Sequence, residues 1–175
     1  MKRVRKILRS FYCAGRGIAF CLRHEKHFRF HLAVTAYVMY FSTFYDFSGT
    51  DYAVLILTCS SVIFMELINT AVEVVIDKVS PQYNIFALIG KDLASGAVLF
   101  AAAGAVAVGI FMFWDMDVLR SIFYYFASAF YRPLILVLSA AGAVIFVSTA
   151  KPRRTGSKRK TDDDSFKLRR KSSKK

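Results

Sequence analysis

The stretch FMELINTAVEVVIDK at residues 64–78 places polar side chains inside a segment that is otherwise typical of a membrane-spanning helix. The preceding run, YAVLILTCSSVI at residues 52–63, is apolar and continues into it without a break, so the two runs predict one long helix. Four polar residues follow at i, i+3, i+7 and i+11: Glu66, Asn69, Glu73 and Asp77. At 100° per residue they share an arc of about 80°, and we call this set the polar stripe.

The polar stripe has a structural and a functional interpretation. In the structural one, its carboxylates pair with Lys or Arg of a neighbouring helix, and Asn69 holds two helices together. In the functional one, the stripe forms a site, which is the usual role of ionisable groups inside a membrane. Burying both Glu66 and Glu73 is unfavourable unless they are protonated, paired or bound to a metal, so we favour the functional interpretation.

Charge is segregated along the 175-residue chain, whose formal net charge is +13. Residues 1–29 hold nine Lys/Arg and one Glu, and residues 151–175 hold twelve Lys/Arg and three Asp. The apolar middle holds four Lys/Arg against eight Asp/Glu, a distribution that predicts a polytopic membrane protein. We expect the basic ends to bind anionic lipid headgroups and not nucleic acid, because no basic platform with interleaved aromatic residues accompanies them.

The pattern predicts an all-α membrane helix bundle with an N-terminal helix lying in the membrane interface. That first segment is basic and amphipathic, and Arg9, Arg16 and Arg23 interrupt any apolar core in it. The expected domains are the interfacial helix at 1–27, a three-helix core at 28–114, an additional transmembrane segment at 115–150 and a basic, disordered tail at 151–175.

Four apolar runs are long enough to cross a bilayer: 28–45, 52–77, 88–114 and 121–150. Arg132-Pro133 interrupts the last run, which leaves 133–150 as its shorter version. The 46–51 loop is acidic, whereas the 77–91 loop carries two lysines and the C-terminal tail is densely basic. The positive-inside rule therefore places that lysine-bearing loop and both termini in the cytoplasm.

A second polar cluster opens the third expected span, in KDLASGAVL at residues 91–99. Lys91 can offset phosphate charge, Asp92 can orient a cation, and Ser95 stacks on Lys91 at i+4. Glu25 and Arg29 reach the same cytoplasmic edge from the first span. Three histidines share a helical spacing, and we favour an interfacial role over metal binding for them: His24, His27 and His31.

Together these residue types outline phosphoryl transfer to a lipid hydroxyl. Carboxylates suit Mg²⁺, which commonly bridges to substrate phosphates, and Lys or Arg side chains suit the phosphates themselves. Glu66, the deepest carboxylate of the polar stripe, suits general-base work on an alcohol. The chain contains no P-loop, kinase glycine loop or HRD-type sequence, so its nucleotide site is expected to be unconventional.

Three motifs resemble the small prokaryotic integral-membrane diacylglycerol kinase family, which includes undecaprenol kinases. They are E-L-I-N-T-A-V-E-x-x-x-D at 66–77, K-D-x-A-S-G-A-V-L at 91–99 and E-K-H-F-R-F-H-L at 25–32. The resemblance covers residues 5–114 and implies a homotrimer in the bacterial plasma membrane. Each protomer would have an interfacial helix and three spans, with active sites shared between neighbouring protomers. The fourth span and the basic tail lie beyond the usual family length.

The resemblance also implies roles for individual residues. Glu66 would be the catalytic base and would meet the lipid substrate together with Ser95. Glu25 and Glu73 would hold the Mg²⁺ that accompanies ATP. The implied nucleotide-binding residues are Arg9, Asn69, Glu73, Lys91 and Asp92, and the loose N-terminal match leaves open which arginine takes part.

Two questions remain open from the sequence: which lipid accepts the phosphoryl group, and whether the protein is a kinase at all. His31 stands where diacylglycerol-specific enterobacterial members carry a carboxylate, and the F-R-x-H sequence looks more like members that phosphorylate undecaprenol. Leu88 and Gly90 also replace the G-x-A that those enterobacterial members place before Lys-Asp. We therefore expect an ATP- and Mg²⁺-dependent lipid kinase with undecaprenol ahead of diacylglycerol. A membrane scaffold or a small cation or proton transporter is the alternative.

Overall fold

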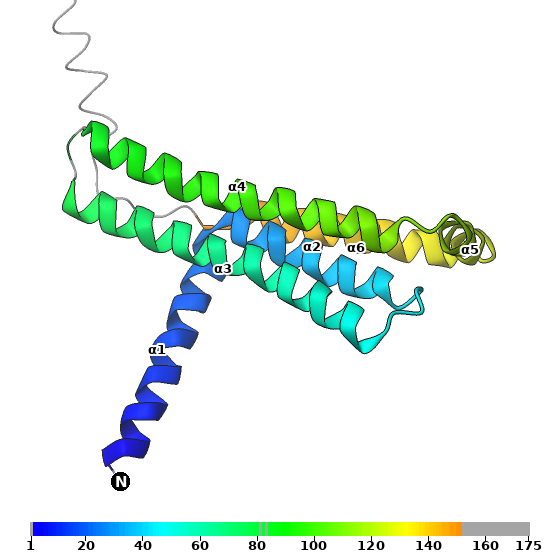
Figure 1. Cartoon of the computed structure of the whole chain (residues 1–175), viewed down its shortest axis with the longest axis horizontal. Helices are drawn as coiled ribbons and strands as arrows, with labels where there is room; N and C mark the ends of the chain where they lie inside the picture. Colours follow the sequence, from blue (N-terminus) through cyan, green and yellow to red (C-terminus); the bar gives the residue numbers. More distant parts are fainter. Residues whose placement is uncertain (1, 81, 83, 152–175) are drawn as a thin grey trace, which may run out of the picture.

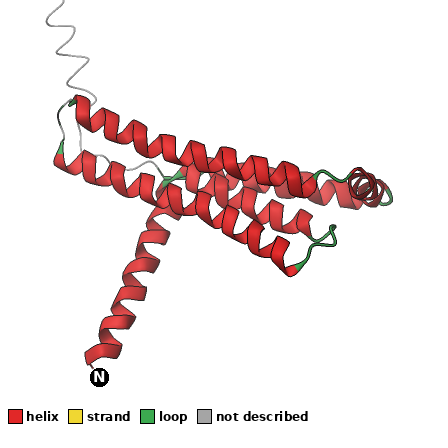
Figure 2. Cartoon of the chain, in the orientation of Figure 1, coloured by secondary structure: helices red, strands yellow, loops and turns green. Residues whose placement is uncertain are grey.

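The computed structural model describes residues 2–80, 82 and 84–151, and within them it contains six helices and no strand (Figures 1 and 2). The prediction of an all-α protein is therefore confirmed. The expected basic tail, apart from Lys151, lies outside the described residues. The helices are α1 (Lys2–His24), α2 (Lys26–Ser42), α3 (Gly49–Val79), α4 (Ile85–Phe113), α5 (Met116–Ala127) and α6 (Tyr131–Ser148).

Helix α1 projects away from the bundle formed by α2, α3, α4 and α6 (Figure 1). Its apolar side chains are exposed, among them Val4, Ile7, Leu8 and Phe11. A helix with basic residues on one face and such apolar residues on another suits a position in the membrane interface. The chain bends at Glu25, which has an extended backbone conformation between α1 and α2.

Three of the described helices are long and apolar enough to cross a membrane: α3, α4 and α6. The sequence predicted four such segments, and the difference lies in α2. That helix has 17 residues and a length of about 26 Å, and it runs from Lys26 to Ser42, whereas the expected run covered residues 28–45. It is one residue shorter than α6.

The last expected span is divided into α5 and α6 by a short connection at residues 128–130. Its shorter version agrees with α6, whose second and third residues are Arg132 and Pro133. Helix α5 is about 18 Å long, too short to cross a bilayer, and lies across the end of the bundle (Figure 1).

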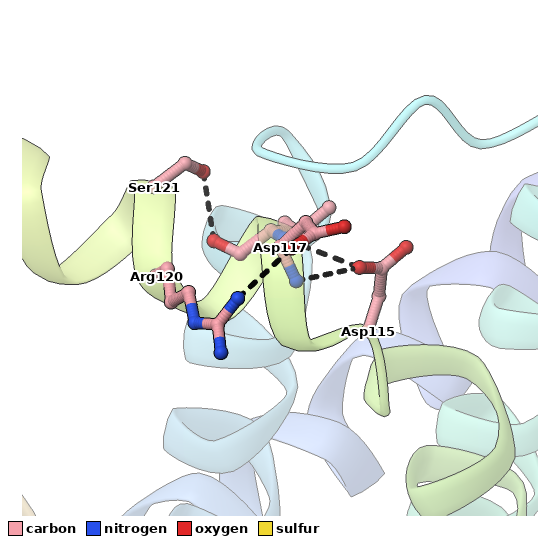
Figure 3. Close-up of polar contacts among 5 residues, drawn as sticks. Asp115, Asp117, Arg120 and Ser121 are labelled. Atoms are coloured by element: carbon pink, nitrogen blue, oxygen red, sulfur yellow. Dashed lines mark hydrogen bonds and ion pairs between the residues drawn. The ribbon is translucent and has the colours of Figure 1, made fainter.

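The start of α5 is capped by the Asp115 carboxylate, which accepts hydrogen bonds from the backbone N–H groups of Asp117 at 2.9 Å and Val118 at 3.2 Å (Figure 3). Such a cap satisfies donors that the first helical turn leaves unpaired. The Asp117 carboxylate accepts a bond from the Arg120 guanidinium at 3.3 Å. Both groups are strongly exposed, so this pair contributes little to stability.

Helices α3 and α4 form a long antiparallel hairpin, which is the most extensive packing in the described chain. A Cβ atom added at Gly90 would lie 3.0 Å from the Ile76 side chain, so the glycine permits the close approach of the two helices near the loop. Asn84 begins α4 by accepting a hydrogen bond from the backbone N–H of Phe86 at 2.8 Å. This hairpin sets the relative positions of the polar stripe and Lys91.

Helix α6 packs along α2. The Tyr37 and Ser139 hydroxyls lie 2.9 Å apart, and the backbone N–H of Lys151 donates to the carbonyl of Arg23 at 3.0 Å. At the opposite end of the bundle, the Tyr45 hydroxyl donates to the carbonyl of Phe113 at 2.9 Å. Burial raises the pKa of the Tyr45 phenol, and the nearby Asp115 charge adds to the shift.

Candidate active site

Glu66 is the buried member of the polar stripe, with only 5% of its surface exposed. Helix α2 brings the His31 ring against it, and His31 Nε2 lies 3.5 Å from Glu66 Oε1. Thr70, one turn further along α3, is also buried. Because Glu66 faces protein, its neighbour His31 becomes part of the site. The sequence analysis left His31 out of the candidate site residues.

Asn69 and Glu73 form the next part of the stripe. The Asn69 Nδ2 group donates to Glu73 Oε1 at 3.3 Å. The Asn69 Oδ1 atom is buried and has no hydrogen-bond partner among the described residues. A buried carbonyl oxygen without a donor is unfavourable, so this atom is suited to a ligand that supplies a donor or a cation. The amide oxygen and the adjacent Glu73 carboxylate are both hard ligands of the kind that Mg²⁺ prefers.

Asp77, at the loop end of the stripe, pairs with Lys91 of α4 through a short contact between Asp77 Oδ1 and Lys91 Nζ. About a third of each side chain is exposed, so the pair remains within reach of a ligand. The structural interpretation therefore holds for Asp77, whose charge is matched by a neighbouring helix. The Lys91 ammonium has three N–H donors and keeps donors for a phosphate oxygen.

Of the expected metal ligands, Glu73 lies on α3 and Glu25 lies at the bend between α1 and α2. Glu25 precedes the first residue of α2, and its side chain does not cap that helix. Over residues 2–80, 82 and 84–151, no group of three or more His, Cys, Asp and Glu side chains could hold a metal ion. A divalent cation at Glu73 would therefore need further oxygen ligands, such as the Asn69 amide and substrate phosphates.

The three histidines are not gathered into one site. His24 Nδ1 lies 3.1 Å from the carbonyl oxygen of Lys151, and His31 contacts Glu66. His27 is exposed on the other side of the α1–α2 bend. The interfacial role expected of the three histidines stays a prediction for His24 and His27, whereas His31 lies against the buried Glu66.

The remaining predicted site residues lie at the edge of the site or away from it. Asp92 is exposed, and the Ser95 hydroxyl donates to the carbonyl of Lys91 at 2.8 Å. Arg9 is exposed on α1, which diverges from the bundle (Figure 1). Within one chain, Arg9 is therefore not brought to the polar stripe.

A largely apolar cavity of about 640 Å³ lies between α2, α3 and α4. One end is lined by His31 and Val62, and the other by Phe113 and Trp114. Glu66 lies one helical turn beyond Val62 and does not line the cavity, so its connection to this space runs through His31. A cavity of this size and character is typical of sites that hold an apolar ligand. We call it the apolar groove.

Arg29 has a role that the sequence analysis did not foresee. Its guanidinium donates to the carbonyl of Leu22 at 2.5 Å, to the carbonyl of Phe146 and to the Thr149 hydroxyl at 3.2 Å. One cation thus joins the C-terminal ends of α1 and α6, where helix dipoles favour positive charge. Because its acceptors are more than a hundred residues apart, no local sequence signal could have revealed this role.

Comparisons with known proteins agree with the motifs. Residues 12–113 match the sequence profile described as prokaryotic diacylglycerol kinase. A diacylglycerol kinase of Synechocystis sp. is 38% identical over 104 residues, 59% of this chain and 59% of that protein. An undecaprenol kinase of Bacillus subtilis is 31% identical over 108 residues, 62% of this chain and 88% of that protein. A diacylglycerol kinase of Escherichia coli is 24% identical over 110 residues, 63% of this chain and 90% of that protein.

No solved structure matches the chain. The chain spans less than two thirds of the length of the Synechocystis protein. The profile match ends at Phe113, the last residue of α4, so α5 and α6 lie outside it. The polar stripe, His31 and Lys91 all lie within the matched residues.

Proposed function

Because this chain belongs to the prokaryotic diacylglycerol kinase family, we propose that it is an integral-membrane lipid kinase that moves the terminal phosphoryl group of ATP to the hydroxyl of a lipid alcohol. The observation that carries the proposal is the buried Glu66 carboxylate in contact with His31, a residue that lines one end of the apolar groove. A lipid whose hydrocarbon chain lies in the apolar groove would place its polar head near His31 and the Glu66 carboxylate.

The lipid side of the reaction rests on Glu66 and His31. Glu66 accepts the proton of the lipid hydroxyl while the hydroxyl oxygen forms a bond to the terminal phosphorus of ATP. The bond between that phosphorus and the bridging oxygen of ADP breaks. His31 holds the Glu66 carboxylate from the α2 side and separates it from the apolar groove. Ser95, one turn after Lys91 on α4, is the proposed further contact to the lipid head.

The nucleotide side rests on the other residues of the polar stripe and on α4. The Asn69 amide oxygen and the Glu73 carboxylate fit Mg²⁺, and Glu25 is the further proposed ligand. Mg²⁺, when bound, neutralises phosphate charge during transfer. Lys91 donates to phosphate oxygens from its position beside Asp77, and Asp92 orients the same region. Arg9 contacts the nucleotide in the assembled protein.

The proposed assembly is a homotrimer with sites shared between protomers. It is supported by the separation of Arg9 from the polar stripe within one chain and by the apolar side chains that α4 exposes, among them Leu99, Phe100 and Phe111. We place the protein in the bacterial plasma membrane with both termini in the cytoplasm, because the polar stripe ends near Lys78 in the last turn of α3, and basic residues favour the cytoplasmic side. The basic ends bind anionic headgroups.

The proposed acceptor is undecaprenol, with diacylglycerol as the second candidate. Relatives named for both acceptors match the chain. His31 in place of a carboxylate beside Glu66 favours the less polar acceptor, because the head of the apolar groove then carries one fewer acid. A scaffold leaves the buried Glu66 unexplained, and a transporter explains the polar stripe but not Lys91 and Asp92 at the same edge of the bundle.

The test is phosphate transfer from labelled ATP by the full-length protein in Mg²⁺-containing detergent micelles. Undecaprenol and diacylglycerol are offered separately, and the labelled lipid is extracted and quantified. Label in undecaprenol above diacylglycerol supports the full proposal, and the reverse order changes the acceptor only. Label in neither lipid, from protein shown by circular dichroism to be helical, would contradict the kinase assignment.

A further inference from the structure

A second cavity, of about 450 Å³, lies between α2, α5 and α6 and shares no lining residue with the apolar groove. Four tyrosines line it: Tyr37, Tyr40, Tyr125 and Tyr131. Its charged lining residue is Arg132. Most of its wall comes from α5 and α6, which lie beyond the residues that match the family profile. The family's chemistry therefore assigns no role to this cavity.

Arg132 is bound to the protein along one edge only. Its Nη1 group donates to the carbonyl of Tyr125 at 2.8 Å and to the Ser128 hydroxyl at 2.5 Å. The guanidinium carbon lies 4.1 Å from the centre of the Tyr125 ring. These contacts cap the end of α5, which is a structural role. They leave the Nε and Nη2 groups without a hydrogen-bond partner among the described residues.

The free edge is the one that binds oxyanions best. The parallel N–H groups of Nε and Nη2 match two oxygens of a phosphate or carboxylate. Stacking on Tyr125 and the two Nη1 bonds hold the guanidinium plane in place, so the fork is oriented before a ligand arrives.

The two arginines of the α5–α6 region differ in their charge balance. Arg120 is paired with the Asp117 carboxylate at 3.3 Å. Arg132 forms no salt bridge with the described carboxylates. A guanidinium without a matching carboxylate among the described residues favours an anionic partner at this cavity.

The position of the cavity indicates the class of that partner. Arg132 is the second residue of α6, a helix suited to crossing the membrane, so its guanidinium lies at the depth of lipid headgroups. Tyrosines are enriched at that depth on both sides of a membrane, and the long side chains of arginines near helix ends extend to it. Ile135 and Leu136 line the same cavity one turn further into the bilayer. The cavity thus presents a cation at headgroup level and apolar side chains at acyl-chain level.

We propose that this cavity binds one anionic phospholipid of the leaflet opposite the Glu66 site. The phosphate accepts two hydrogen bonds from Nε and Nη2 of Arg132, and one acyl chain lies along Ile135 and Leu136. The bound lipid bridges α2 and the α5–α6 hairpin. Lipid binding at this site does not require kinase activity, so the proposal can be tested separately from the proposed reaction.

The experiment is native mass spectrometry of the full chain released from mild detergent after incubation with phosphatidylglycerol or phosphatidylcholine of equal acyl chains. We expect phosphatidylglycerol adducts to exceed phosphatidylcholine adducts. Arg132→Gln should reduce phosphatidylglycerol affinity about tenfold, because it removes a bidentate charge-assisted contact. Arg120→Gln is the matched control, because it also removes one positive charge from the α5–α6 region, and it should bind phosphatidylglycerol as the original protein does. Both variants keep the basic α1, so lipid bound there contributes equally to the two measurements.

Thermal unfolding gives a second measurement. Phosphatidylglycerol should raise the Tm of the original protein and of Arg120→Gln, and it should raise the Tm of Arg132→Gln much less. Arg132→Lys keeps the charge but loses the paired N–H donors, so phosphatidylglycerol should raise its Tm by an intermediate amount, less than in the original protein and more than in Arg132→Gln. This variant provides the comparison even if Arg132→Gln folds poorly. Equal phosphatidylglycerol binding by Arg132→Gln and Arg120→Gln would overturn the proposal. Displacement of the lipid by millimolar inorganic phosphate would also overturn it, because the site would then be one for free anions.

Discussion

The polar stripe of α3 and the α5–α6 hairpin both place polar groups in an apolar bundle, yet they use them differently. In the stripe, Asn69 Oδ1 is buried without a partner among the described residues, and Glu66 is in contact with the His31 ring. At the ends of the hairpin, Asp115 accepts from the first N–H groups of α5, and Arg29 of α2 donates to the carbonyl of Phe146 near the end of α6. Polar atoms that cap helices hold a fold together, whereas polar atoms left without a protein partner are available to a substrate.

The largest effect is expected at Glu66. Glu66→Gln keeps the shape of the side chain and removes the proposed base, so kcat should fall by roughly 10²–10⁴. The Tm should change little, because an amide can still contact His31. Activity is measured as labelled lipid formed per minute, with the exposed hairpin variant Asp117→Asn as the control that stays active. Full activity in Glu66→Gln would remove Glu66 from the role of base.

A smaller effect is expected at the Asp77–Lys91 pair, where the structural and functional interpretations can be separated. Lys91→Met should raise the KM for ATP about tenfold or more, because one charged contact to phosphate is lost. It should also lower the Tm, since Asp77 is left unpaired. In the double variant Asp77→Asn/Lys91→Met the Tm should recover while the KM stays high. Recovery of both would show that the pair only holds α3 and α4 together.

His31 should affect the lipid side and not the nucleotide side. His31→Phe removes the contact to Glu66 but keeps an aromatic ring on the wall of the apolar groove. We expect kcat/KM for the lipid to fall about tenfold, with the KM for ATP unchanged. His31→Gln can still donate to Glu66 and should retain more activity. Equal losses in the two variants would mean that the ring is needed for packing alone.

The smallest effect on catalysis is expected at Arg29, which contacts helix ends and no proposed substrate group. Arg29→Met should release the end of α6 from α1, so backbone amides near residues 145–151 should exchange hydrogen faster. The KM for ATP and for lipid should stay within about twofold of the original values, since the contacts of Glu66 and Lys91 are unchanged. A selective rise of the KM for ATP would instead place Arg29 in the nucleotide site.

Local sequence patterns were sufficient for much of the fold. Long apolar runs predicted α3 and α4, because a helix satisfies its own backbone groups in lipid. The Arg132-Pro133 break indicated a start of the last span at residue 133, two residues after the first residue of α6, because proline is well tolerated in the first helical turn. The end of α2 at Ser42 was not predicted. The residues that follow pack against Phe113 at the end of α4 through Tyr45 and Phe47, and this contact between distant parts of the chain leaves no local sequence signal.

The candidate site was also partly predictable from local sequence patterns. The spacing of Glu66, Asn69 and Glu73 places them on one face of any α-helix, whatever the helix packs against. Their partners were not predictable from spacing. His31 reaches Glu66 because α2 packs on α3, and Lys91 reaches Asp77 because Gly90 permits the close approach of α3 and α4.

By itself, the sequence determined that this protein is helical, that it belongs in a membrane and that one helix carries a stripe of acids. Those properties depend on composition and on the period of the helix, which act over a few turns of chain. Only the tertiary structure decided that Asp77 is paired, that the Asn69 oxygen has no partner among the described residues, and that Arg29 joins α1 to α6. Those outcomes depend on which helices touch, and contacts between residues far apart in the chain leave no periodic signal.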